Sequence, residues 1–404
     1  LPGLIAPFLA QMMAEKWGRR WPIWVGSVIN IVGAVVNAAS KDLAIYIAGR
    51  VLMGIGIAMG ISIAPTLLQE LAHPRYRAPL GSMYTSIYYI AAVISASICL
   101  GTGAISDNNA WRIPCYLQLV GPAATLALTI GMAESPRWLV MHGQAEKALD
   151  ALARYHSNGV VDDPLVQLEY REIRAMLSAD GLCPASHYGD LFKGSNRHRL
   201  IILLAIGCGT NWVGNGIITY YLASILSGIG ITSSRDQSIL NVGLQVWNLI
   251  LSISAALSVD KIGRRPLWLT STIGIFFALA IIMGLSGSYA QSNNSAVGIA
   301  VVPFLFIFFG FYVIAWTPLS NMYTVEVLPY YLRTKGQAVY CFTQNAANAF
   351  NQWVNPIALD SIEWRYYGLY LAVQAVLIAI IYFKFPETKN LTIEEIAAIF
   401  DGDR

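Results

Sequence analysis

The 404-residue chain has few charged residues and no cluster of cysteines. Asp, Glu, Lys and Arg make up only 12% of it, against roughly 25% in soluble domains. The net charge of +3 is small and no basic stripe is present, which argues against nucleic-acid binding. The five cysteines lack C-x-x-C spacing. We therefore predict no metal site, no other cofactor and no disulfide framework.

Acidic side chains and histidines are missing from the middle of the apolar stretches. No Asp or Glu lies at a mid-span position, and the five histidines all lie in loops. An enzyme acting inside the membrane would need a cluster of such groups. The sequence therefore predicts no catalytic residues and no enzyme activity. We also expect no signal peptide in these 404 residues.

Apolar residues dominate the composition. The hydrophobic fraction is 56% and the mean hydropathy is +0.53. A helix needs about 20 apolar residues to cross the hydrocarbon of a bilayer. The pattern predicts an all-α membrane protein with eleven spans, near 2–13, 22–39, 43–67, 80–104, 113–132, 200–227, 239–258, 267–287, 298–322, 336–358 and 366–384.

Charged pairs repeat in the same order in the two halves of the chain. Glu15/Arg19, Glu70/Arg77 and Glu134/Arg137 are matched by Asp260/Arg264, Glu326/Arg333 and Glu387/Lys389. The interval is about 250 residues each time, and such duplication of a helical bundle is typical of secondary transporters. We predict a transmembrane half over 1–132, a cytoplasmic linker over 133–199, a second half over 200–384 and a cytoplasmic tail over 385–404.

The distribution of basic residues predicts the orientation. The loops that carry the repeated pairs, the linker and the tail hold most of the Lys and Arg. The opposite loops hold only Lys41, Arg112, Arg235 and Arg365. Cytoplasmic loops carry such an excess, so we place the repeated pairs in the cytoplasm. The glycosylation sequon at Asn293, in an opposite loop, agrees with this.

The linker and the tail carry helix-start signals. Ser135 precedes a proline, and Asp163 does the same at a second site. Between them, 144–155 is predicted to be a helix with one apolar face. Thr392 and Glu395 form a capping box in the tail. These helices either tie the halves together or bind a regulatory partner.

Taken together, the motifs resemble those of the sugar porters of the major facilitator superfamily. They are the paired D/E-x-x-G-R-R loops, Arg50-x-x-x-Gly54-x-Gly56, Pro65…Glu70…Arg77, Glu134-Ser-Pro-Arg137 and Pro386-Glu-Thr-Lys389. Finer features resemble the fungal lactose permease and cellodextrin transporter branch. The resemblance implies two pseudo-symmetric six-helix halves, about eleven of twelve helices being present here. The first helix is then the missing one, and we expect the 404 residues not to transport without it.

The resemblance also implies a function. A sugar, a disaccharide or a hexose, would cross the membrane by alternating access, with protons as the coupling ion in the intact form. We expect a monomer in the lipid bilayer of the plasma membrane. Two alternatives remain open: a sensor on the same fold that does not transport, and a porter for a polyol or quinate-type solute. The short tail argues against the sensor.

In the family, the repeated loops form a cytoplasmic gate that holds the halves together. The resemblance assigns this gate to Glu15, Arg19, Glu70, Arg77, Glu134, Arg137, Asp260, Arg264, Glu326, Arg333 and Glu387. The alternative is that these residues only fix the topology and cap helices. Arg50 is the one ionised group deep in a span, so we expect it to face the interior with a partner. By resemblance it takes part in proton coupling.

Amide side chains within the spans are the predicted sugar contacts, because amides offer paired donors and acceptors to hydroxyl groups. Asn211 and Asn215 are spaced to share a helical face, as are Gln344 and Asn348. Gluing helices together is the alternative role. The resemblance adds Asn248 and four departures from the family's hexose site: Thr85, Thr210, Asn211 itself and Asn321, with Trp316 near Asn321. Shorter contacts leave room for a larger ligand such as a disaccharide.

Overall fold

The computed structural model describes residues 2–180, 187–194, 196–228, 230–292, 294–389 and 399–400. These residues form helices and no strand, which confirms the predicted all-α fold. The chain divides into two compact units. Unit 1 comprises Leu1–Gly81, Trp111–Lys193 and Leu328–Phe342, and unit 2 comprises Ser82–Ala110, Gly194–Val327 and Thr343–Arg404.

Nine helical stretches in the described part of the chain are long and apolar enough to cross a membrane. They are Arg20–Ala38, Leu43–Leu71, Pro79–Thr102, Asn109–Ile130, Asn196–Thr219, Ser234–Ser258, Arg264–Ser292, Ala296–Val327 and Trp364–Lys384. Each matches a predicted span. Of the other two, 2–13 overlaps the 12-residue α1 (Ala6–Trp17). The span 336–358 lies within the 33-residue α17 (Tyr330–Ile362), whose many Asn and Gln residues lower its hydropathy.

Unit 1 contains the first helices of the chain and the linker helices. Its elements are η1 (Pro2–Leu4), α1, α2 (Arg20–Ala38), α3 (Leu43–Leu71), η2 (Pro74–Tyr76), α6 (Asn109–Leu117), α7 (Val120–Ile130), α8 (Pro136–Met141), α9 (Ala145–His156), α10 (Pro164–Asp180) and η3 (Tyr188–Phe192). Helix α4 (Arg77–Ser86) and α17 each run through both units, and the first two residues of α6 belong to unit 2. Ala6, Ala10 and Ala14 of α1 pack with Ile63 and Leu67 of α3 in the unit's core. Small side chains on α1 permit this close approach.

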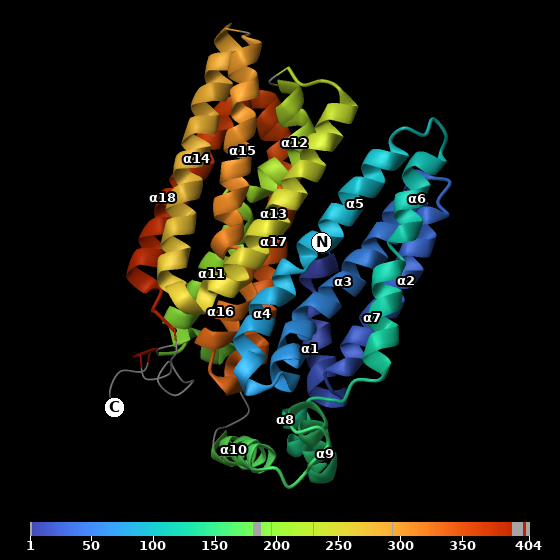
Figure 1. The fold of residues 1–404 in the computed structure, drawn as a ribbon, viewed down its shortest axis with the longest axis vertical. Helices are drawn as coiled ribbons and strands as arrows, with labels where there is room; N and C mark the ends of the chain where they lie inside the picture. Colours follow the sequence, from blue (N-terminus) through green and yellow to red (C-terminus); the bar gives the residue numbers. More distant parts are fainter. Residues whose placement is uncertain are drawn as a thin grey trace. The chain divides into compact units, whose positions relative to one another are not determined.

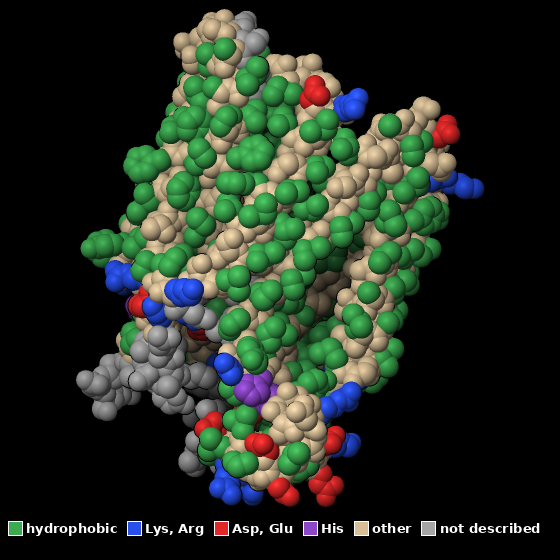
Figure 2. Space-filling model, viewed as in Figure 1, with side chains coloured by type: hydrophobic (Ala, Val, Ile, Leu, Met, Phe, Trp, Pro, Cys, Tyr) green, Lys and Arg blue, Asp and Glu red, His purple; other side chains and the backbone are tan. Residues whose placement is uncertain are grey.

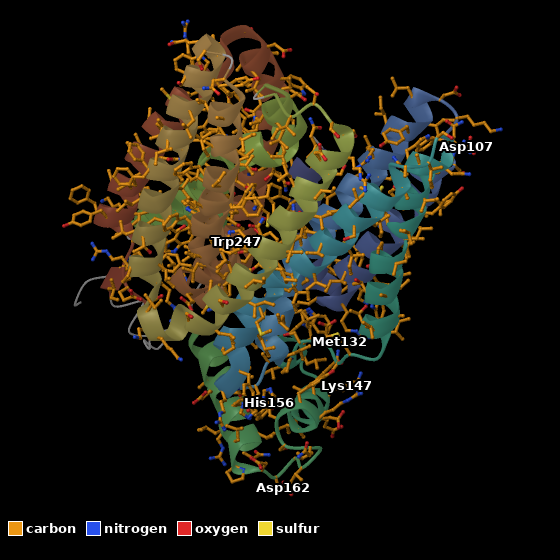
Figure 3. All side chains as sticks on the ribbon, turned by 45° about the horizontal axis from the view of Figure 1, so that its top comes forward. Asp107, Met132, Lys147, His156, Asp162 and Trp247 are labelled. Atoms are coloured by element: carbon orange, nitrogen blue, oxygen red, sulfur yellow. The ribbon has the colours of Figure 1, made fainter. Side chains whose placement is uncertain are left out.

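The linker forms the predicted helices, seen in green at α8–α10 in Figure 1. The Ser135 hydroxyl accepts a hydrogen bond from the Trp138 N–H and so caps α8, as the Ser-Pro signal predicts. Asp163 caps α10 by accepting from the Leu165 N–H at 2.8 Å. Helix α9 buries Ala148 and its neighbours on one face, and His156 lies at its end (Figure 3). The predicted capping box at Thr392 and the sequon at Asn293 lie outside the described residues.

Unit 2 contains one helix from the first half of the sequence and most of the second half. Its elements are α5 (Tyr88–Thr102), α11 (Asn196–Trp212), α12 (Asn215–Gly228), α13 (Ser234–Ile262), α14 (Arg264–Ser292), α15 (Ser295–Ala315), α16 (Pro318–Val327), η4 (Glu363–Tyr366) and α18 (Tyr367–Lys384). Helix α5 packs on α13, and α14 packs on α15 and α18 (Figure 1). The core is aromatic: Trp268 packs edge-to-face against Trp316 and Phe385.

Large hydrophobic side chains are exposed along the helices of both units. Leu128 is 74% exposed and Phe277 is 62% exposed, for example. In Figure 2 hydrophobic side chains cover the helix faces in view, while Lys, Arg, Asp and Glu gather over α8–α10 and at helix ends. In water such a surface would be unfavourable, whereas in a bilayer it faces lipid tails.

Candidate substrate site and charge networks

The first charged loop positions a carboxylate at the start of α2. Gly18 turns the chain with a φ of 103°, a conformation that costs glycine little. Glu134 then accepts hydrogen bonds from two backbone N–H groups, that of Arg19 at 2.9 Å and that of Arg20 at 3.2 Å. A negative charge that binds free N–H groups at a helix N-terminus is stabilising. Glu134 is therefore a helix cap supplied from 115 residues away.

The Arg19 side chain pairs with a second carboxylate in unit 1. Its Nε lies 3.3 Å from Glu70 Oε2, and the two side chains are 6% and 4% exposed. The Ser135 hydroxyl also donates to Glu70. Arg137 and Arg333 add favourable electrostatic interactions with the same carboxylate. Glu70 thus connects α3, the start of α2 and the first turns of α17.

The second charged loop repeats this geometry in unit 2. Gly263 has a φ of 104°, and Glu387 accepts from the N–H of Arg264 at 2.9 Å and of Arg265 at 3.0 Å. The Arg264 guanidinium lies 3.2 Å from Glu326 Oε1. The Thr388 hydroxyl donates to Glu326 Oε2 at 2.8 Å, in the place that Ser135 takes in unit 1. The sequence duplication is therefore also a duplication of hydrogen bonds.

The second arginine of each loop binds a helix C-terminus instead of a carboxylate. Arg20 donates to the Ile130 carbonyl at 2.8 Å and Arg265 to the Tyr382 carbonyl at 2.6 Å. Both guanidinium groups also lie near an aromatic ring, Trp24 at 4.5 Å for Arg20 and Tyr382 at 5.5 Å for Arg265. A cation at the last carbonyls of a helix is favourable. The sequence showed the repeated Arg-Arg pair, and only the structure identifies these acceptors.

Glu15, another predicted gate residue, contributes a backbone atom instead of its carboxylate. Glu15 is exposed, and its backbone carbonyl accepts from the Trp138 indole at 3.1 Å. No ion pair of its carboxylate occurs among the described residues. The side chains of Arg77 and Asp260 lie outside the described residues.

The amide-rich run at the start of the second half falls on a helix break. Helix α11 ends at Trp212 and α12 begins at Asn215, with Gly214 between them at a φ of 93°. The continuous helix that would place Asn211 and Asn215 on one face is therefore interrupted. Asn211 donates to the Gln344 carbonyl at 3.1 Å, and Asn215 accepts from the Thr219 hydroxyl at 2.9 Å.

Gln344 and Asn348 lie one turn apart on the continuous helix α17, and both are half-buried. Asn248 on α13 is only 1% exposed, and its Oδ1 has no hydrogen-bond partner among the described residues. An unpaired buried acceptor costs about 1–3 kcal/mol. The Asn248 oxygen can therefore accept a hydrogen bond from a further group.

The remaining predicted contacts are Thr85, Asn321 and Trp316, which come from different parts of unit 2. Thr85 on α4 and Asn321 on α16 are both half-buried. Trp316 follows α15, is 1% exposed and lies with its ring centroid 4.7 Å from that of Trp268. It also fills the space beside Gly209. Trp316 thus forms part of the core of unit 2 in this structure.

The sequence profile of the family described as "Sugar (and other) transporter" matches residues 2–400. The chain belongs to this transporter family. Relatives include the MFS-type transporter oryC of Aspergillus oryzae, 29% identical over 96% of this chain and 73% of that protein. The high-affinity glucose transporter of Kluyveromyces lactis is 26% identical over 97% of this chain and 74% of the relative.

Solved structures agree on the fold of this transporter. The proton:xylose symporter XylE, bound to 6-bromo-6-deoxy-D-glucose, matches with a TM-score of 0.84 and 21% identity, covering 99% of this chain and 87% of that one. The match confirms the predicted major facilitator superfamily fold. The transporter is a multi-pass membrane protein and not an enzyme.

Arg50 of the transporter lies on α3 and is exposed. Its guanidinium donates to the Tyr46 hydroxyl at 2.8 Å, one turn earlier on the same helix. No carboxylate lies within ion-pair distance of it in the described part of the chain. The expected interior partner is therefore replaced here by a phenol on its own helix.

Two groups near the predicted site were missed by the sequence reasoning. Ser252 is fully buried one turn after Asn248, and its Oγ has no partner among the described residues. Tyr89 on α5 is 6% exposed and hydrogen-bonds to the Thr317 hydroxyl at 3.2 Å. The four-residue spacing from Asn248 could have indicated Ser252, whereas Tyr89 had no signal in the sequence.

Proposed function

We propose that the transporter moves a sugar across the membrane by alternating access. The observation that carries this proposal is the set of amides in unit 2 with polar atoms still available for binding. Asn248 keeps a buried, unpaired oxygen, and the half-buried Gln344 amide bonds to no other described residue. Amides suit sugar hydroxyls because each offers two donors and an acceptor. The name of the K. lactis relative supports a sugar substrate.

The proposed contacts favour a substrate larger than one hexose ring. The proposed set keeps three amides, Gln344, Asn348 and Asn248. Thr85 and Asn321, however, replace larger side chains of the hexose site that the family resemblance implies. Short side chains leave space beside the substrate. We therefore propose a disaccharide, or a hexose held with fewer contacts, as in the fungal lactose permease and cellodextrin branch. Asn211, Asn215 and Trp316 complete the proposed set.

We also propose that protons drive uptake and that Arg50 takes part in the coupling. An intramembrane arginine requires a polar partner, and its present partner is the neutral Tyr46 hydroxyl. A carboxylate that pairs with Arg50 in one state and is protonated in another would couple sugar uptake to the proton gradient. The fold neighbour described as a proton:xylose symporter supports this mechanism. We place the protein, as a monomer, in the plasma membrane.

The paired charge networks are proposed as the cytoplasmic gate. Because Arg333 interacts favourably with Glu70, a residue of the second half of the sequence stabilises a carboxylate of the first half. Glu326 holds the matching place in unit 2. Glu326→Gln should lower net uptake while the purified protein still binds sugar with unchanged affinity. Equal losses of uptake and binding would show that Glu326 belongs to the binding site instead.

An uptake panel tests the proposed function. The protein is expressed from its complete reading frame in a host without its own sugar carriers. It is then offered labelled glucose, lactose, cellobiose, xylose and quinate, with and without a protonophore. Saturable uptake of a sugar that the protonophore abolishes is the expected result. Uptake of quinate alone would favour the polyol or quinate porter, and sugar binding without any uptake would favour a sensor.

A further inference from the structure

The break between α11 and α12 leaves backbone carbonyls without their helical partners. In a continuous helix the carbonyls of residues 210–213 would accept from the N–H groups of residues 214–217. No such bond is made among these described residues, and the ladder resumes with Ile218 N–H to Gly214 O at 3.2 Å. Inside a membrane bundle each open carbonyl requires another donor.

Buried side chains from three other helices supply those donors. The Tyr312 hydroxyl of α15 donates to the Thr210 carbonyl at 3.1 Å. Asn351 of α17 donates from Nδ2 to the Asn211 carbonyl at 3.3 Å. Gln374 of α18 donates from Nε2 to the Val213 carbonyl at 2.7 Å. Three of the four open carbonyls are thereby satisfied.

The two amides are set in place by their surroundings. Asn351 is 1% exposed and Gln374 is 0% exposed. The Tyr370 hydroxyl lies 3.5 Å from Asn351 Oδ1 and donates at 2.8 Å to Asn355 Oδ1. A Cβ atom added at Gly216 would lie 2.5 Å from Asn351 Nδ2. Glycine at position 216 therefore leaves the space that the Asn351 amide occupies.

The same atoms connect to two residues of the proposed sugar site. Asn351 holds the carbonyl of Asn211, and the Asn211 side chain donates to the carbonyl of Gln344 at 3.1 Å. Gln374 holds Val213, two residues before Asn215. Rotation of the chain at the break would redirect the side chains of both asparagines. Hydrogen bonds on both sides of Trp212 limit that rotation.

We propose that Asn351 and Gln374 are positioning residues for the substrate site, an inference that rests on the proposed function. They bind the open carbonyls of the interrupted helix and so fix the directions of the Asn211 and Asn215 amides. Both side chains are almost completely buried, and each gives an amide N–H to a backbone carbonyl of the break. Loss of either bond should loosen the break and weaken sugar binding, without slowing the transport step itself.

Two variants test the hydrogen bonds of Asn351 and Gln374 to the helix break in different ways. Gln374→Leu removes one donor and introduces an apolar side chain of similar size. Gly216→Ala leaves both amides in the sequence but places a methyl group where the Asn351 amide lies. The φ of Gly216 is not in the positive range, so alanine is compatible with its helical backbone. Gln291→Leu, at an exposed position near the end of α14, is the matched control.

Each variant is measured in two ways. Hydrogen–deuterium exchange of the purified protein reports on the backbone at residues 209–218. Uptake of labelled glucose and cellobiose gives KM and the maximal rate per transporter at the cell surface. We expect both variants to raise exchange in this segment and to raise KM about tenfold, which corresponds to about 1.4 kcal/mol. The maximal rate should stay within about twofold, and Gln291→Leu should change neither measurement.

The outcomes distinguish the positioning role of Asn351 and Gln374 from the proposed function. Unchanged exchange in both variants would show that the two amides do not hold the break. Raised exchange with unchanged KM would show that they hold it without positioning the site. A lower maximal rate at constant KM would indicate an ordinary structural role and also overturn the proposal. If the unsubstituted protein takes up neither sugar, the proposed function fails at these substrates and the positioning role fails with it, whatever the exchange shows.

Discussion

Replacing Glu134 by glutamine tests whether this residue is a helix cap or only a partner for arginine side chains. In the structure its two carboxylate oxygens each accept one backbone N–H at the start of α2, those of Arg19 and Arg20. Glutamine has nearly the same shape, but it is neutral and has a single acceptor oxygen. One N–H would therefore face an NH2 group, and the negative charge at the helix N-terminus would be lost.

The size of the effect follows from these contacts. A hydrogen bond to a charged group contributes about 1.5–3 kcal/mol, and an unsatisfied buried donor costs a similar amount. Glu134 is half-buried, so solvent screening reduces both contributions. We expect Glu134→Gln to destabilise the protein by about 2 kcal/mol, at the upper end of measured helix-cap losses. For a unit of this size that corresponds to a fall in Tm of about 5 °C.

The assay is heating of the detergent-purified protein followed by size-exclusion chromatography, which records the fraction that stays monodisperse. Glu15→Gln is the matched control, because Glu15 is an exposed carboxylate on the preceding helix. Its Tm should change by no more than about 1 °C. If Glu134→Gln shifts the Tm no further than Glu15→Gln, the carboxylate does not act as a cap.

Three further predictions concern the repeat, the site and the topology. Gly263→Ala should lower the Tm by several degrees in a thermal-shift measurement. Gly263 has a φ of 104°, and an added Cβ would lie 2.8 Å from a Glu387 oxygen. An unchanged Tm would contradict the duplicated cap. Gln344→Ala should raise the KM for sugar uptake several-fold at unchanged surface expression, whereas reduced expression at constant KM would make it a structural amide. A cysteine at Asp107 should react with an impermeant maleimide on intact cells and one at Gly143 should not, in a background without the native cysteines; labelling at Gly143 would reverse the orientation.

Much of the fold could be predicted because membranes impose simple requirements on a sequence. Apolar length alone identified nine spans that the structure reproduces as helices. Caps are also local, so the Ser-Pro and Asp-Pro signals correctly gave the starts of α8 and α10. The span within α17 did not meet the apolar criterion, because its amides serve tertiary hydrogen bonds.

The site was less predictable, since its geometry depends on a helix break and on distant partners. A spacing of four residues places Asn211 and Asn215 together only in a continuous helix, and Gly214 interrupts it. Gln374 had no local signal that it would bind Val213, which is 161 residues away in sequence. Likewise, burial of Trp316 against Trp268 depends on the packing of separate helices.

The sequence by itself determined that this is a duplicated, all-helical membrane protein. That follows from hydropathy and from charged pairs repeated in order, which need no knowledge of contacts. Only the tertiary structure decided which atom each charge binds. It assigned Glu134 and Glu387 to backbone N–H groups and Arg20 and Arg265 to helix-terminal carbonyls. The physical reason is that backbone donors and acceptors are present at every residue, so their partners are selected by folding and not by residue type.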